Sequence, residues 1–174
     1  KYIERLKKRA EGEDAVAMRN LGFFYRDGAR GLTQNYRKAI ELLLRAGELG
    51  DARGFYNLGV VYDNGIGLEN DAKRAKYYYE IAAMGGNVKA RYNLGITEYN
   101  AGNKSRAVKH WMLSAEAGDD DSLNEIRECF LNGGATKDDF EKALRAHKDA
   151  TDAMKSEQRE AYAAACAAYA ASDQ

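Results

Sequence analysis

The fold is decided by residues 51–86, which read DARGFYNLGVVYDNGIGLENDAKRAKYYYEIAAMGG. This stretch predicts two short helices joined by a glycine-rich loop, and the rest of the chain repeats it with small changes. A Leu-Gly pair recurs at separations of 37 and 36 residues, beginning at Leu21, Leu58 and Leu94. An alanine of the second helix recurs at separations of 36, 32 and 36 residues, as Ala39, Ala75, Ala107 and Ala143. A fixed period of this length is typical of stacked helical repeats.

Short polar side chains mark the predicted helix starts. An Asp or Asn stands four residues before each recurring alanine, at Asn35, Asp71, Asn103 and Asp139. A side-chain oxygen at this place accepts a hydrogen bond from a backbone N–H that has no partner within the helix. Glycines close three of the units, at Gly50, Gly86 and Gly118, and an Asp or Asn follows each of them directly. Because these turns are short, successive helices are expected to pack antiparallel.

The repeats organise the chain into a single predicted domain. It comprises a leading half-unit at 1–12, repeats at about 14–50, 51–86, 87–118 and 119–154, and a terminal helix at about 155–172 that caps the open edge of the core. The stretch 140–171 contains no glycine. It has two interpretations, either one long helix or two helices that are broken near 149–152.

Composition and charge narrow the possible function classes. Lysine plus arginine and aspartate plus glutamate number 27 each, and this zero net charge argues against a nucleic-acid partner. No apolar run reaches membrane-spanning length, so membrane insertion is not expected. The two cysteines show no pairing pattern, which favours a reducing compartment and a soluble cytoplasmic location. The chain begins with Lys1 and not with methionine, so it is expected to be a piece of a longer protein.

The spaced positions resemble the Sel1-like repeat, a relative of the tetratricopeptide repeat. In the second unit the resemblance is carried by Leu58, Gly59, Tyr62, Gly65, Gly67, Asp71, Ala75, Tyr78, Ala82, Ala83 and Gly86. Gly54 departs from the pattern, because the family prefers alanine there, and the fourth unit matches only in part. The resemblance implies an all-α fold, a right-handed α/α solenoid, and a role as a scaffold or adaptor for protein partners.

Three further segments resemble the Sel1 region of eukaryotic proteins that carry a RING-type zinc finger ahead of the repeats. They read GNVKARYNLGITEYNAGN, KHWMLSAEAG and ATKDDFEKALRAHKDA. No zinc-ligand cysteines occur in the chain, so this resemblance implies a ubiquitin-ligase part upstream of Lys1 and a substrate-recognition arm here. A structural subunit of a larger assembly is a further alternative.

A binding surface is predicted on the first helices of the repeats. If Leu58 points into the core, the opposite side of its helix carries cationic, aromatic and amide side chains. First helices line the concave face in solenoids of this family, so the predicted site comprises Arg19, Asn20, Phe23, Arg53, Tyr56, Asn57, Lys89, Tyr92 and Asn93. Asparagine amides can bond both the N–H and the C=O of a partner backbone, and tyrosine supplies rigid contact area. The alternative is that the asparagines bond neighbouring turns or repeats and that the tyrosines pack in the core, and both interpretations stay open.

The second helices supply another candidate surface. Tyr77, Tyr78 and Tyr79 cannot all point inward, so at least one of them is expected on the convex face. Trp111 is expected in the core between second helices.

Catalytic motifs and ligand-binding motifs are not expected. His110 and His147 fall in different units, and nothing in their spacing requires contact with Cys129. The loop at 63–69 is rich in oxygen-bearing side chains but lacks the ligand spacing of a calcium loop. The sequence therefore predicts no enzyme, no cofactor and no metal, and it predicts a protein or peptide as the partner.

Overall fold

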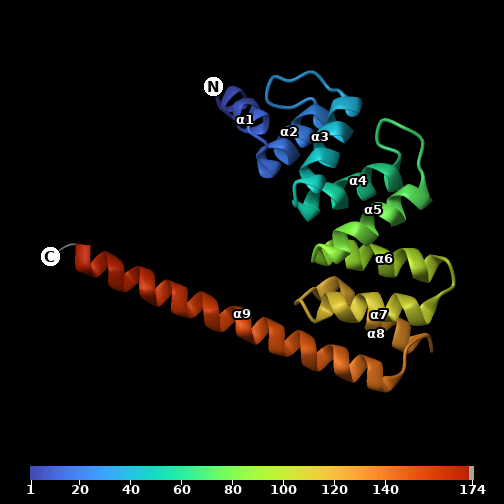
Figure 1. Ribbon diagram of the computed structural model, residues 1–174. Coiled ribbons are helices and arrows are strands. Elements are labelled where there is room, and N and C mark those ends of the chain that lie inside the picture. Colours follow the sequence, from blue (N-terminus) through green and yellow to red (C-terminus); the bar gives the residue numbers. More distant parts are fainter. Residues whose placement is uncertain (173–174) are drawn as a thin grey trace. The chain divides into compact units, whose positions relative to one another are not determined.

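A computed structural model of the chain describes residues 1–172, and the side chains of all of these except 162, 163 and 165–172. Within residues 1–172 it contains nine helices and no strand (Figure 1). The helices are α1 (Tyr2–Glu11), α2 (Ala15–Asp27), α3 (Tyr36–Glu48), α4 (Ala52–Asn64), α5 (Ala72–Met84), α6 (Val88–Asn100), α7 (Lys104–Ala115), α8 (Asp120–Leu131) and α9 (Lys137–Ser172). The predicted all-α fold is therefore confirmed.

The helices fall into two compact units. Unit 1 comprises Lys1–Thr97 and contains α1 to α5 with most of α6, and unit 2 begins at Glu98 and contains α7 to α9. In unit 1, α2 and α3 form one helix pair and α4 and α5 form the next, and α1 precedes them as a single helix.

Aspartate and asparagine side chains begin four helices of unit 1, as the sequence predicts, whereas α1 follows Lys1 and has no side-chain cap. The caps of α2, α3, α4 and α5 each accept a hydrogen bond from a backbone N–H of the first turn, and they are Asp14, Asn35, Asp51 and Asp71. Each bond satisfies a backbone N–H that the helix itself leaves without a partner.

Two predicted caps in unit 2 are wrong. Asn103 makes no capping bond to α7, and its amide Nδ2 instead donates to Glu98 Oε2 at 2.8 Å. Asp139 lies inside α9, where its Oδ2 accepts from the Thr136 N–H at 3.1 Å while Thr136 Oγ1 accepts from the Asp139 N–H at 3.1 Å. This reciprocal pair is a capping box, and it starts α9 at Lys137.

Acid is expected to destabilise the protein through its capping carboxylates. Hydrogen bonds from the Thr136 hydroxyl and N–H lower the pKa of Asp139, and bonds from the Ala17 N–H and from Arg9 lower the pKa of Asp14. A carboxyl whose pKa is lower in the folded state stabilises the fold above its unfolded pKa, and this contribution is lost as the pH falls below about 4 and through the folded pKa. The free energy of unfolding, measured by urea denaturation, should therefore fall with pH more steeply in the wild type than in an Asp139→Asn variant. Parallel pH dependences of the two proteins would contradict this assignment.

Close helix contacts in unit 1 depend on glycines. Leu58 is fully buried, as the sequence predicts, and it packs in a cluster with Leu43 and Val61. A Cβ on Gly54 would lie 2.6 Å from the Leu43 carbonyl oxygen and 2.6 Å from the Gly47 nitrogen, so α3 and α4 touch backbone to backbone. Interiors at this packing density have no room for an added methyl group.

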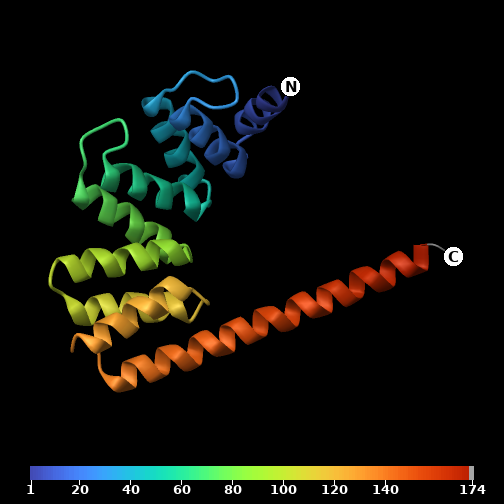
Figure 2. The ribbon, with the colours of Figure 1, turned by 180° about the vertical axis from the view of Figure 1, so that it is seen from behind.

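Unit 2 is built around Trp111, which is buried as predicted and has its ring 5.7 Å from that of Tyr99. The first part of α9 packs against α7 and α8, where the rings of Phe140 and Phe130 stack at 5.7 Å. The helix then continues without a break to Ser172, which confirms the interpretation as one long helix (Figure 2). Every side chain at 152–161 is exposed, and most of the side chains beyond them lie outside the described part of the chain. A capping role for 155–172 stays a prediction.

Candidate functional site

The predicted binding residues lie on α2, α4 and α6 of unit 1, whereas Leu21, Leu58 and Leu94 on the same helices are buried. We call this set the first-helix face, which comprises Arg19, Asn20, Phe23, Arg53, Tyr56, Asn57, Lys89, Tyr92 and Asn93. Arg53 and Lys89 are exposed, and the other seven side chains are half-buried. Most of the face is therefore in contact with its own protein as well as with solvent.

An ion pair joins the first helices of two consecutive repeats. Arg19 Nε on α2 donates to Asp51 Oδ2 at 2.6 Å, and the two side chains are only 13% and 11% exposed. The guanidinium carbon of Arg19 also lies 5.9 Å from the centre of the Phe23 ring, a cation–π distance. Because its charge is matched by Asp51, Arg19 holds α2 to the start of α4 and is not a free cation.

All three asparagines of the first-helix face make bonds within unit 1. Asn57 Nδ2 donates to the carbonyl oxygen of Arg53 at 2.5 Å, and Asn20 Oδ1 accepts from Arg19 at 3.3 Å. The Asn93 side chain hydrogen-bonds the hydroxyl of Tyr79. These are bonds of the kind that the alternative interpretation describes. An amide offers two N–H donors and an acceptor oxygen, so the single bond of Asn57 leaves the rest of its amide for a partner.

Tyr79 on α5 positions two members of the first-helix face, although the sequence does not single it out for that role. It is 1% exposed, its hydroxyl donates to Asp63 Oδ2 at 3.2 Å, and its ring centre lies 6.1 Å from that of Tyr56. Burial, and then the charge of Asp63, raises its pKa, so the hydroxyl stays protonated as a donor. Tyr79 thus holds both Tyr56 and Asn93 in place.

The run of three tyrosines divides between core and surface. Tyr77 is 57% exposed, Tyr78 is half-buried and stacks on Tyr62 at 5.6 Å, and Tyr79 is buried. The prediction that at least one of the three is exposed is confirmed. The helical period places the three side chains at three different angles around α5, so the sequence predicts that they differ in exposure. It does not predict the contacts of Tyr79.

A shallow hollow of about 410 Å³ opens on the first-helix face between α2 and the start of α4. Its lining residues are Ala15, Val16, Arg19, Leu49, Gly50, Asp51 and Arg53. The structure thus brings two predicted residues, Arg19 and Arg53, to one place. It adds Val16, which is 46% exposed and which the sequence reasoning missed. Val16 lies 37 residues before Arg53, which is the separation between their repeats. Comparing equivalent positions of the repeats would therefore have predicted Val16 as part of the site.

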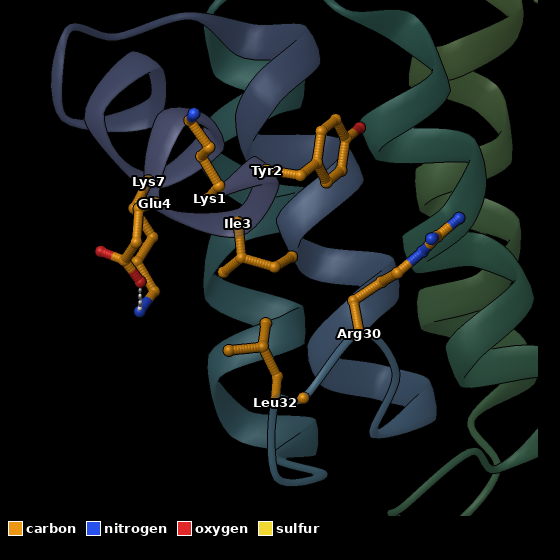
Figure 3. A pocket seen from close by; sticks show the side chains of 8 residues that line it. Lys1, Tyr2, Ile3, Glu4, Lys7, Arg30 and Leu32 are labelled. Atoms are coloured by element: carbon orange, nitrogen blue, oxygen red, sulfur yellow. Dashed lines mark hydrogen bonds and ion pairs between the residues drawn. The ribbon is translucent and has the colours of Figure 1, made fainter.

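A second hollow of about 420 Å³ lies between the start of α1 and the loop after α2 (Figure 3). Tyr2, Ile3 and Leu32 supply its apolar side chains, and Lys7 at its rim pairs with Glu4 at 3.0 Å. No residue of the first-helix face lines this hollow, so it forms a separate feature of unit 1.

Comparison with known proteins identifies the repeat. The family model described as the Sel1 repeat matches residues 15–51, 56–87 and 88–119, more than half of the chain. The chain belongs to the Sel1 repeat family. The matched segments contain eight of the nine residues of the first-helix face, and Arg53 lies between the first two of these segments.

This Sel1 chain is similar to proteins from plants and bacteria. The ERAD-associated E3 ubiquitin-protein ligase component HRD3B of Arabidopsis thaliana is 31% identical over 106 residues, which cover 60% of this chain and only 16% of that relative. The crystal structure of a Sel1 repeat protein from Oxalobacter formigenes has a TM-score of 0.74 at 27% identity and covers 87% of this chain and 63% of its own. The protective antigen c5321 of uropathogenic Escherichia coli, which has an SLR fold, has a TM-score of 0.73 at 33% identity and covers 86% of this chain and 33% of its own. These structures support the predicted helical repeat solenoid.

The side chains with reactive groups do not assemble a catalytic site in the described part of this Sel1 chain. Cys129 is buried, and burial raises the pKa of its thiol, which disfavours the nucleophilic thiolate. His147 Nε2 lies 2.8 Å from Asp120 Oδ1, a contact that ties α9 to α8. Among the residues described, no group of His, Cys, Asp and Glu is placed to hold a metal ion, and no helix is long and apolar enough to cross a membrane. Sel1 repeat proteins are protein-interaction scaffolds, so the site to be explained is a surface for a protein partner.

Proposed function

We propose that this Sel1 chain is an interaction scaffold that binds a segment of a protein partner on its first-helix face. The observation that carries the proposal is the hollow between α2 and α4, where Arg19, Arg53 and the exposed Val16 converge. A concave site that combines a few placed polar groups with apolar surface is the usual form of a binding site.

The first-helix face is organised before a partner arrives. Arg19 is held by Asp51, and Tyr79 contacts both Tyr56 and Asn93. Side chains that are already fixed lose little conformational entropy on binding, so more of the contact energy is available as affinity. Aromatic residues and arginine are also the residue types that most often dominate the energy of protein interfaces.

Photocrosslinking from single positions tests the proposal. A benzoylphenylalanine residue at position 53 or 57 should form a covalent adduct with the same partner protein in an extract of the native source, because both side chains lie on the first-helix face. The matched controls are positions 37 on α3 and 80 on α5, which are exposed and lie outside that face. Truncating Tyr56 is a poorer test, because its ring packs against the buried Tyr79 and its loss would disturb the fold as well.

The outcome that would contradict the proposal is an adduct from positions 37 and 80 that is absent from positions 53 and 57. Such a result would move the binding surface to the second helices, where Tyr77 is exposed.

A second candidate function is favoured by one comparison. HRD3B is named a component of an E3 ubiquitin-protein ligase, and its similarity covers 60% of this chain. On this reading the Sel1 chain is the substrate-recognition arm of a RING-type ligase. An excess of the isolated chain should then compete for the crosslinked partner in cells and reduce its ubiquitylation. Unchanged ubiquitylation, at a level of expression that captures the partner, would exclude this role and leave the scaffold proposal intact.

A further inference from the structure

The hollow on the first-helix face has an unequal charge balance. Asp51 is the acidic residue among those that line it, and both of its oxygens are engaged. Oδ2 accepts from Arg19 Nε at 2.6 Å, and Oδ1 accepts from the backbone N–H of Arg53 at 3.1 Å. Within the described part of the chain the Arg53 side chain has no ion pair. The hollow therefore presents one cation that no lining residue neutralises.

A basic residue recurs at the equivalent position of the next repeat. Lys89 stands 36 residues after Arg53, at the same place in the next repeat, and is also exposed. Two consecutive repeats therefore carry an exposed basic side chain at this position of the first helix.

An apolar side chain lies next to the free cation. Val16 is 46% exposed, and Ala15 and Leu49 line the same hollow. Contact with an apolar group would remove the Val16 side chain from water, which is favourable. A polar partner group in the same place would not provide this stabilisation. The hollow therefore suits a negative charge and a small apolar group side by side.

We infer that the segment bound by the first-helix face carries an aspartate or glutamate next to a small aliphatic residue, with its carboxylate at Arg53 and its aliphatic side chain on Val16. The inference rests on the proposed function and names the chemistry of the partner for the same site. Guanidinium groups bind carboxylates through two parallel N–H···O bonds, which fixes the orientation as well as the charge of the bound group.

Selection from a random peptide library tests the inference on the full chain. The peptides are joined to the display protein at both ends, so they offer side-chain carboxylates and no free C-terminus. Peptides retained by the wild type should be enriched in Asp or Glu beside Val, Ala or Leu. Their binding, measured by fluorescence polarisation of the synthetic peptides with amidated ends, should weaken about tenfold in Arg53→Gln, the loss expected for one charge-assisted hydrogen-bonded contact.

Two controls assign that loss to the contact. Arg37→Gln on α3 makes the same chemical change outside the first-helix face and should change binding by less than about twofold. Replacing the acidic residue of the peptide by its amide should weaken binding to the wild type and have little further effect on Arg53→Gln, as expected for two groups that contact each other. Circular dichroism of both variants verifies that they are folded.

The possible failures are distinguishable. Selected peptides that crosslink to a photoreactive residue at position 57 but carry no acidic residue would overturn the carboxylate inference and leave the first-helix face as the binding surface. Peptides that crosslink only at position 37 or 80 would overturn the inference and the proposed function together. A library that yields no binder would also count against both.

Discussion

Replacing Tyr79 with alanine is expected to lower the free energy of unfolding by about 3–5 kcal/mol, the range found when large aromatic residues are removed from a core. The ring is 1% exposed and packs in a cluster with Tyr62, Ala82 and Leu94. It also packs against Gly59 on α4, where an added Cβ would meet the Tyr79 ring, so the truncation removes the ring that fills this space. Urea denaturation followed by circular dichroism measures the change.

The matched control for this variant is two residues away on the same helix. Tyr77→Ala removes the same side chain from a position that is 57% exposed, and its effect should stay within about 0.5 kcal/mol. A Tyr79→Phe variant keeps the ring and deletes the hydroxyl that donates to Asp63, so its loss should be about 1 kcal/mol. Equal losses in Tyr77→Ala and Tyr79→Ala would show that the cluster around Tyr79 does not form in solution.

Replacing Gly54 with valine is expected to cost about 3 kcal/mol, because overpacking a well-filled core is destabilising. The added Cβ would lie 2.6 Å from backbone atoms of Leu43 and Gly47, and backbone atoms cannot rotate away as the end of a side chain can. Valine has a somewhat higher helix propensity than glycine, a gain of a few tenths of a kcal/mol that does not offset the clash. Thermal or urea denaturation measures the net effect.

Gly12→Val provides the comparison for Gly54→Val. Gly12 follows α1 with a negative φ, and the nearest atom to an added Cβ is 3.4 Å away, an ordinary contact distance. Its substitution should leave stability within about 0.5 kcal/mol. A Gly54→Val variant as stable as Gly12→Val would mean that α3 and α4 are separated by more than the structure shows.

The fold can be predicted from the sequence because the helices of each repeat are specified by interactions within that repeat. The caps at Asp14, Asn35, Asp51 and Asp71 are local side-chain bonds to the following turn, and the period of the leucines assigns the buried side. The two wrong caps lie where a nearby residue makes a different hydrogen bond from the one that the repeat pattern predicts. Asn103 bonds Glu98, five residues earlier, and the Thr136–Asp139 capping box starts α9 three residues before the predicted start.

The contacts of the predicted site could not be predicted from the sequence. The helical period shows on which side of a helix a residue lies, but it does not show which residues its side chain contacts. The side of α4 that carries Arg53, Tyr56 and Asn57 follows from the period alone. That Arg19 pairs with Asp51, 32 residues away, depends on how two repeats stack. The contact of Tyr79 with Asn93 likewise joins two repeats, and its contact with Tyr56 depends on how the two helices of one repeat pack. The helical period of a single helix contains neither kind of information.

Asp51 takes part both in the start of a helix and in the contact between two repeats. One oxygen of its carboxylate initiates α4, and the other binds Arg19 of the preceding repeat. Nearest-neighbour descriptions of repeat proteins assign one free energy to each repeat and another to each junction. In this chain the Asp51 carboxylate contributes to both free energies. The start of α4 is therefore favoured when the preceding repeat is folded and Arg19 is in place. Because such a coupling is reciprocal, order in either α2 or α4 promotes order in the other.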